Sequence, residues 1–261
     1  MDLGLKGKRA LVLSASRGLG RAIAESLAAE GVDVVLSARS ADRLQEAADA
    51  INARGAGRAS FVASDLKGNV DAIHAQAVEM LGGPVDILIA NTGGPPAGTA
   101  LGVKSESWTD QFEAMVVPVF RVAELVLPAM RQGGFGRIII VASSGIVQPI
   151  PNLVMSNALR SSVLGWAKTL SAEVAAHGIT VNLVLPGRIE TARTGELDTA
   201  NAAKQGKSVD EVAAAARAAI PAGRYGRVEE FADVACFLAS QRASYVTGGT
   251  VRVDGGAIRS V

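Results

Sequence analysis

The chain has 261 residues, of which 49% are hydrophobic and only 4% are aromatic, and it contains 29 glycines. Lys and Arg number 26 against 25 Asp and Glu, so the net charge of +1 gives no electrostatic reason to expect a nucleic acid or an anionic membrane as partner. The single cysteine, Cys236, excludes an internal disulfide, and no Cys/His cluster has metal-ligand spacing. We therefore expect a cytoplasmic protein with an aliphatic core and neither a metal site nor a membrane partner.

Short β-branched runs alternate with helical patterns along the chain, which is typical of repeated βαβ units. Strands are expected at residues 10–13, 32–36, 58–63, 85–90, 137–142, 180–185 and 250–253, and helices at 19–30, 41–53, 70–81, 109–130, 155–176 and 229–239. Right-handed crossovers between such strands predict a single α/β domain over residues 1–261. Its expected architecture is a Rossmann-type, doubly wound parallel sheet of seven strands flanked by helices.

Residues 187–226 break this alternation, because the segment is polar and carries only a short helix, begun by Ser208 and Glu211 in a capping-box pattern. It follows a strand end, so we interpret it as a lid over a substrate crevice. An inert surface insertion is the alternative reading. Arg188 and Arg193 near its start mildly favour an anionic substrate bearing a carboxylate or phosphate, although salt bridges within the lid explain them equally well.

A turn of small residues follows the first strand and opens directly into a helix. It runs Ser14, Ala15, Ser16, Arg17, Gly18, Leu19 and Gly20. A backbone that approaches a pyrophosphate closely cannot carry bulky side chains, and a helix N-terminus supplies free N–H groups. The turn therefore predicts dinucleotide binding.

The end of the second strand distinguishes between the two nicotinamide dinucleotides. An NAD-selective fold places Asp or Glu there to bind the ribose 2′-hydroxyl, whereas this chain has Arg39. Together with Arg17, it can clamp a 2′-phosphate through charge-assisted hydrogen bonds. NADP(H) is therefore expected in preference to NAD(H), unless both arginines are merely solvated surface residues.

Further short motifs extend this pattern over most of the chain. They are Asp65-Leu66, Asn91-Thr92-Gly93, Pro186-Gly187 followed by Ile189 and Thr191, and two C-terminal motifs, Tyr245-Val246-Thr247-Gly248 and Val253-Asp254-Gly255-Gly256. With the small-residue turn, these motifs resemble the short-chain dehydrogenase/reductase family from about Leu5 to Gly256, and the resemblance implies that all but the two C-terminal motifs lie at the cofactor. The resemblance implies that the Asp-Leu pair contacts adenine and that the Pro-Gly motif lies beside the nicotinamide. It also implies hydride transfer to or from a carbonyl or alcohol.

The family works with a Ser, a Tyr, a Lys four residues after the Tyr, and an Asn on the preceding long helix. By the resemblance, Ser143 binds the substrate carbonyl, while Ser156, Arg160 and Met115 stand at the Tyr, Lys and Asn positions. A serine hydroxyl is a far weaker acid than a tyrosine, whose free pKa is roughly 10. Ser156 is thus a candidate proton donor or only a helix cap or space filler, and Arg160 can still bind the nicotinamide ribose.

Two other groups are candidates for proton supply. Pro118 lacks the N–H that would bond the carbonyl of Ala114, and we hypothesise that the resulting kink frees a backbone carbonyl to hold a catalytic water. Tyr225, in the expected lid, is the one tyrosine that could move close enough to the active site to donate a proton.

The helices expected at 109–130 and 155–176 are apolar over more than one face, which predicts a second buried surface. The family resemblance suggests a homotetramer packed through them. The favoured function is an NADP(H)-dependent oxidoreductase with a divergent active site, acting on a carbonyl or alcohol as a 3-oxoacyl-type or other ketone reductase does. The alternative is a catalytically silent NADP(H)-binding sensor or scaffold on the same fold.

Overall fold

Seven β-branched and aliphatic runs form parallel strands in the computed structural model, which describes residues 1–260. They are β1 Arg9–Leu13, β2 Asp33–Ala38, β3 Ala59–Ala63, β4 Ile87–Ala90, β5 Gly136–Val141, β6 Ile179–Pro186 and β7 Thr250–Val253. Their order across the sheet is β3-β2-β1-β4-β5-β6-β7, so the winding reverses between β1 and β4. The predicted doubly wound sheet is confirmed, and ligands of such sheets bind at the carboxyl ends of the strands near this reversal.

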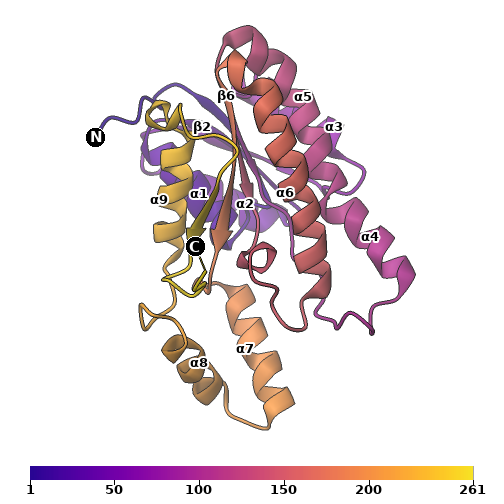
Figure 1. Cartoon of the computed structure of the whole chain (residues 1–261). Helices are drawn as coiled ribbons and strands as arrows, with labels where there is room; N and C mark the ends of the chain where they lie inside the picture. The colour runs from indigo at the N-terminus through magenta and orange to yellow at the C-terminus, as the bar shows by residue number, and fades with distance from the viewer. Residues whose placement is uncertain (261) are drawn as a thin grey trace.

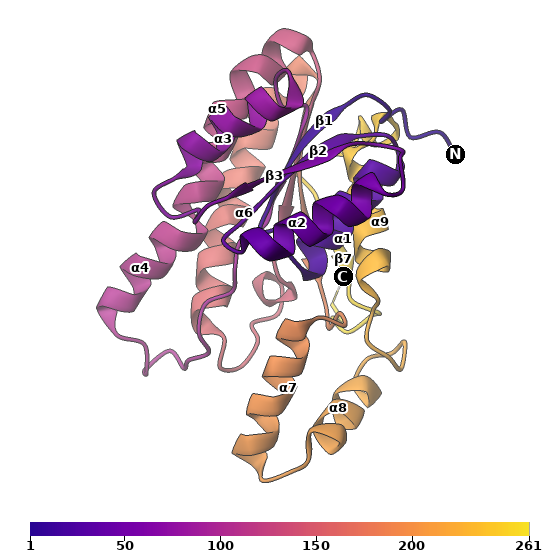
Figure 2. The same ribbon diagram turned by 180° about the vertical axis from the view of Figure 1, so that it is seen from behind.

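The helices cover both faces of the sheet (Figure 1). They are α1 Gly18–Ala29, α2 Ala41–Asn52, α3 Val70–Leu81, α4 Ser105–Met115, α5 Val117–Gly133, α6 Val154–Val174, α7 Ala192–Gln205, α8 Val209–Ala218 and α9 Val228–Ala239, with the short 3₁₀ helices η1 Ser144–Ile146, η2 Ala175–His177 and η3 Gln241–Ala243. Figure 2 shows α1, α2 and α9 on one side, and α3, α5 and α6 on the other. No helix of residues 1–260 is both long enough and apolar enough to cross a membrane.

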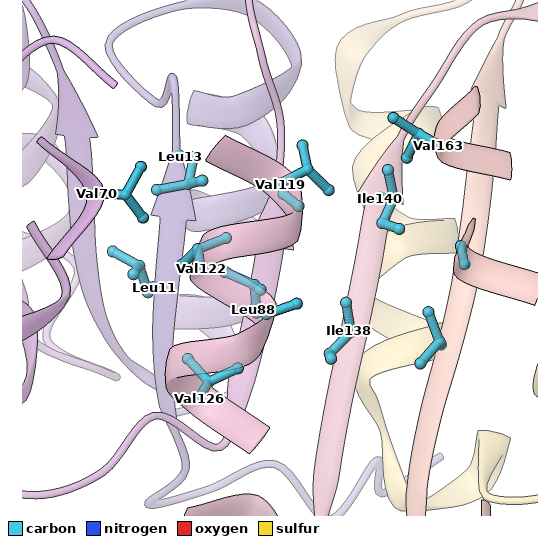
Figure 3. Close-up of a cluster of buried hydrophobic side chains, with 14 of the residues drawn as sticks. Leu11, Leu13, Val70, Leu88, Val119, Val122, Val126, Ile138, Ile140 and Val163 are labelled. Carbon is cyan, nitrogen blue, oxygen red and sulfur yellow. The ribbon is translucent and has the colours of Figure 1, made fainter. Parts of the chain in front are cut away.

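The five central strands are buried on both faces, which explains their nearly continuous apolar sequences, whereas the edge strands β3 and β7 are partly exposed. One core lies between the sheet and α3, α5 and α6 (Figure 3), and its side chains include Leu11, Leu13, Val70, Leu88, Val119, Val122, Val126, Ile138, Ile140 and Val163. Alternate residues of the same strands, such as Ala10 and Val12, face the second core under α1, α2 and α9. The central strands therefore pack against helices on both faces, and their carboxyl ends carry the loops that follow them.

The single helix expected at 109–130 is two helices, α4 and α5, which meet at Val116. Pro118 lies in the first turn of α5, where its missing N–H is tolerated. The N–H of Val119 donates to the carbonyl of Val116 at 3.0 Å, a tighter turn than an α-helix makes. The interruption predicted from Pro118 is therefore confirmed as a helix break. Pro128, by contrast, lies inside α5 without ending it.

The segment 187–226 contains two helices, α7 and α8, where the sequence predicted one. The capping box at α8 is confirmed, because Ser208 Oγ accepts from the N–H of Glu211 at 3.2 Å and the Glu211 carboxylate accepts from the N–H of Ser208 at 2.9 Å. Both helices project beyond the sheet, away from the two helical layers (Figure 1). At their base, Gly226 exchanges backbone hydrogen bonds with Arg188 and Glu190 at 2.9 and 2.8 Å, which closes the segment into a loop with joined ends.

Candidate functional site

The turn after β1 has the tight backbone that its small residues predict. Ser14 adopts a φ of 50°, in the left-handed region that favours glycine. A Cβ added to Gly20 would lie 2.5 Å from the carbonyl oxygen of Ser14, so α1 approaches the turn as closely as a glycine allows. The amide of Asn91 donates to the same carbonyl at 3.4 Å, which ties the turn to the residues after β4.

The start of α1 suits an anion. The N-cap residue is Arg17, and no side chain caps the N–H groups of the first turn. Uncapped N–H groups at a helix N-terminus bind phosphate through their hydrogen bonds and the helix dipole. The chain thus offers a backbone cradle where the sequence placed the pyrophosphate of a dinucleotide.

The two arginines expected at a 2′-phosphate lie at neighbouring strand ends, because β1 and β2 pair in parallel with Leu13 opposite Ser37. The side chain of Arg17 is 56% exposed and that of Arg39 is 82% exposed. Each has one distant carboxylate: Arg39 Nη1 lies 4.0 Å from Asp65 Oδ2, and Arg17 Nη2 lies 3.7 Å from Glu196 Oε1. Both guanidinium groups therefore remain accessible to an anionic ligand.

The other predicted cofactor residues follow neighbouring strands at the same edge of the sheet. Asp65 and Leu66 follow β3, residues 91–93 follow β4, and Pro186 ends β6. A Cβ on Gly187 would lie 2.6 Å from the Cα of Asp254, which explains why a glycine stands at this close approach. The strand ends thus gather residues from distant parts of the chain along one edge.

Thr191 is the N-cap of α7. Its Oγ1 accepts from the N–H of Thr194 at 3.3 Å, while Thr194 Oγ1 donates to the carbonyl of Ile189. The three residues hold the start of α7 beside the end of β6.

Ser143 follows β5 and caps η1 by accepting a hydrogen bond from the N–H of Gly145 at 3.1 Å. Because this bond uses only an acceptor site of Oγ, the hydroxyl proton remains free to be donated. Ser156 lies in the first turn of α6 and is 9% exposed. The N-cap of α6 is Leu153, so the reading of Ser156 as that cap is wrong.

Arg160 is bound to backbone carbonyls. Its Nη1 donates to Val141 at 2.9 Å, and its Nη2 donates to Thr92 at 3.4 Å and to Gly93 at 3.2 Å. Burial lowers the pKa of the guanidinium to about 10, and among residues 1–260 no carboxylate counteracts this shift. The side chain remains a cation at neutral pH, and it joins the end of β5 to the residues after β4.

A cavity of about 10 Å³ lies between this guanidinium and the α4–α5 break, which is room for one water. The side chains and backbone that line it are those of Ala90, Thr92, Met115, Val116, Val119, Ile140, Val141, Ala142, Leu159, Arg160 and Val163. Thr92 and Arg160 carry its only polar side-chain groups. Met115 and Val116 line the cavity on the side of the helix break, whereas Ala114 and Pro118 do not line it.

Tyr225 does not face the predicted proton-transfer position. Its hydroxyl donates to Asp198 Oδ2 at 2.8 Å inside the segment 187–226, and the residue is 7% exposed. Burial, followed by the hydrogen bond to Asp198, raises the pKa of Tyr225, which makes it a weaker acid still. Arg188 pairs with the same buried carboxylate, so a salt bridge within the segment accounts for this arginine.

Two residues that the sequence did not single out organise the surrounding loops. The amide of Asn157 bonds both the N–H and the carbonyl of Ile150, at 3.3 and 3.0 Å, and so holds the loop between η1 and α6. Glu196 contacts two arginines, Arg17 and Arg193. Of these two contacts, only the one with Arg193 could be expected from the sequence, because the two residues lie three apart on a helix. No cluster of His, Cys, Asp or Glu within residues 1–260 could hold a metal ion.

Comparison with known proteins agrees with this geometry. The sequence profile of the enoyl-(acyl carrier protein) reductase family matches residues 14–257. The chain is 38% identical over 258 residues to the 3-oxoacyl-(acyl-carrier-protein) reductase FabG of Escherichia coli strain K12, covering 97% of this chain and 98% of that protein.

Two solved structures are also similar. L-sorbose reductase from Gluconobacter frateurii, complexed with NADPH and L-sorbose, matches with a TM-score of 0.94 and 34% identity over 100% of both chains. YwfH, an NADPH-dependent reductase of bacilysin biosynthesis, matches with a TM-score of 0.92 and 29% identity over 97% of this chain and 99% of its own. With its sheet order, its turn after β1 and these likenesses over nearly its full length, the chain belongs to the short-chain dehydrogenase/reductase family of oxidoreductases.

Proposed function

We propose that this chain is an NADP(H)-dependent oxidoreductase that transfers hydride between the nicotinamide and a carbonyl or alcohol substrate. The observation that carries the proposal is the pair of accessible guanidinium groups, Arg17 and Arg39, beside an uncapped helix N-terminus at neighbouring strand ends. Guanidinium groups bind phosphate through charge-assisted hydrogen bonds. Two of the similar structures are described with NADPH, which supports the same cofactor here.

The bound cofactor supplies or accepts the hydride, and the protein supplies its placement. We assign the pyrophosphate to the turn and the first N–H groups of α1, and adenine to the Asp65-Leu66 pair after β3. The nicotinamide end is assigned to Pro186, Gly187, Ile189, Thr191 and the residues after β4, namely Asn91, Thr92 and Gly93. These assignments follow the strand ends along one edge of the sheet.

On the substrate side, the free hydroxyl proton of Ser143 is assigned to the substrate carbonyl oxygen. Arg160 is assigned to the nicotinamide ribose through the N–H donors that its three backbone carbonyls leave unused. The proton comes from Ser156 or from a water in the cavity beside Arg160. The substrate class is a ketone, as the names of the E. coli and Gluconobacter relatives suggest.

Residues 187–226 are proposed to cover the bound substrate. Support comes from two contacts that α7 makes with neighbouring loops: Arg193 Nη2 donates to the carbonyl of Pro95 at 3.2 Å, and Glu196 approaches Arg17 in the turn. An anionic substrate would rely on Arg193, whose side chain is 48% exposed.

We also propose a homotetramer packed through α5 and α6. The two helices carry a groove that is lined by apolar side chains together with Arg121 and Glu124, and in it the rings of Phe120 and Trp166 lie 4.5 Å apart. Val117 is 43% exposed beside them, and Leu127 and Leu170 complete the apolar wall. Sedimentation of the purified protein should show a species near four times the chain mass of 26.7 kDa. A single species at the chain mass would contradict the proposal.

The cofactor assignment is tested by calorimetric titration with NADPH and, separately, with NADH. We expect NADPH to bind at least about tenfold more tightly, which corresponds to roughly 1.4 kcal/mol. The variant Arg39→Gln should reduce the affinity for NADPH and leave that for NADH unchanged, because only NADPH carries the 2′-phosphate. If neither nucleotide bound the wild-type protein, the oxidoreductase proposal would be wrong.

A catalytically silent NADP(H)-binding protein is the second candidate, and one observation favours it. Arg160 directs donors at three backbone carbonyls, so it already has a role in joining strand ends. The discriminating variants are Ser143→Ala and the double variant Ser156→Tyr with Arg160→Lys, assayed with NADPH and an acetoacetyl thioester. An enzyme loses turnover on Ser143→Ala. A silent protein shows no turnover to lose, and turnover gained only by the double variant would support the second candidate.

A further inference from the structure

One carboxylate of the lid segment bridges two arginines at the edge of the proposed cofactor site. Glu196, in α7, places Oε1 at 3.7 Å from Arg17 Nη2 and Oε2 at 3.5 Å from Arg193 Nη1. Arg193 in turn donates to the carbonyl of Pro95, in the loop after β4. The chain of contacts therefore runs from the turn after β1, through α7, to the loop after β4.

We infer that Glu196 determines the affinity for NADP(H) by competing with the 2′-phosphate for the guanidinium of Arg17. The inference rests on the proposed function, because it takes Arg17 to be a 2′-phosphate ligand. Each N–H of Arg17 that faces the carboxylate in α7 is unavailable to a 2′-phosphate, so the two acceptors compete for the same guanidinium. Glu196 thus acts on specificity through the guanidinium of Arg17.

The ion pair of Arg17 with Glu196 is weaker than the interaction of Arg17 with a phosphate, so a phosphate displaces the carboxylate. The side chains of Arg17 and Glu196 are 56% and 50% exposed, and their atoms are too far apart for a short hydrogen bond. Exposed pairs of this kind contribute little free energy. A phosphate carries more charge and accepts a bidentate pair from guanidinium. The cofactor phosphate can therefore displace the carboxylate, at a small cost in affinity.

The exchange has a consequence for the lid segment. Glu196 provides an ion pair between α7 and the turn after β1, where Thr191 also lies close to Gly18, whereas Arg193 links α7 to the loop after β4. When Arg17 binds a 2′-phosphate, its ion pair with Glu196 is lost, and the hydrogen bond of Arg193 to Pro95 remains. Binding of NADP(H), but not of NAD(H), thus removes one ion pair between α7 and the nucleotide-binding turn.

The test is calorimetric titration of Glu196→Gln with NADPH and NADH. We expect NADPH to bind about two- to five-fold more tightly than it binds the wild type, the size expected for loss of one exposed ion pair, while the affinity for NADH stays unchanged. The matched control is Asp210→Asn in α8, which removes one negative charge from the same segment. An equal gain for both nucleotides, or an equal gain from Asp210→Asn, would show a general charge effect and overturn the inference.

A second pair of variants tests the competition directly. In the Arg17→Gln background, the further change Glu196→Gln should leave the NADPH affinity unchanged, because the contested guanidinium is absent. A gain that persisted there would overturn the inference while leaving the proposed function intact. Failure of the wild-type protein to bind NADPH would overturn both.

Discussion

The end of β1 and the ends of β4 and β5 are built in opposite ways. After β1, the backbone folds tightly around Gly20, and the cation Arg17 is left exposed. At β4 and β5, the cation Arg160 is partly buried and its donors are directed at backbone carbonyls. The first place thus offers backbone N–H groups and an exposed guanidinium to a ligand, whereas the second offers only the donors of Arg160 that the backbone carbonyls leave unused.

The largest effect is expected where the backbone is tightest. Gly20→Ala places a Cβ within 2.5 Å of the Ser14 carbonyl oxygen and 2.9 Å of the Asn91 amide nitrogen, so the turn or α1 must move. We expect the NADPH affinity to fall at least about tenfold, and the free energy of unfolding to fall by about 1–3 kcal/mol. Gly133→Ala in α5 is the control, because a Cβ there meets nothing within 4 Å. Unchanged binding by Gly20→Ala would remove the turn from the cofactor site.

Arg160→Met should act mainly on stability. It removes the donors of three backbone carbonyls and leaves partly buried acceptors without partners. We expect the free energy of unfolding to fall by about 1–3 kcal/mol in denaturant titration. Arg43→Met, at an exposed position in α2, should change it by less than about 0.5 kcal/mol. Equal stability of both variants would mean that Arg160 does not join the strand ends.

Ser14→Gly should have the smallest effect, and one of opposite sign. The left-handed φ of 50° is unfavourable for serine and free for glycine, while glycine costs more entropy on folding. We expect a net gain of up to about 1 kcal/mol in thermal or denaturant unfolding. Ser16→Gly makes the same chemical change at a residue without a positive φ and should destabilise the protein. A loss of stability in Ser14→Gly would show that the entropy cost of glycine and the loss of the hydroxyl together outweigh the relief of backbone strain.

The sequence predicted the strands because their signal is local. All seven strands were expected within about two residues of their observed ends, and the capping box of Ser208 and Glu211 was correctly identified. The helix break was anticipated from Pro118, but α7 was not, because its polar sequence has no strong apolar face. Pro128 shows the converse, since a proline inside α5 did not end the helix that the core holds in place.

The sequence by itself determined the doubly wound sheet, the glycine-lined turn and the presence of Arg39 where a carboxylate would favour NAD. These depend on residue spacing, on backbone conformation and on one side chain beside a strand end. Only the tertiary structure decided that Arg160 binds backbone carbonyls up to 68 residues away, that Tyr225 donates to Asp198, and that Glu196 reaches Arg17. Such partners are chosen by how rigid elements dock, and no local pattern of residues encodes that choice.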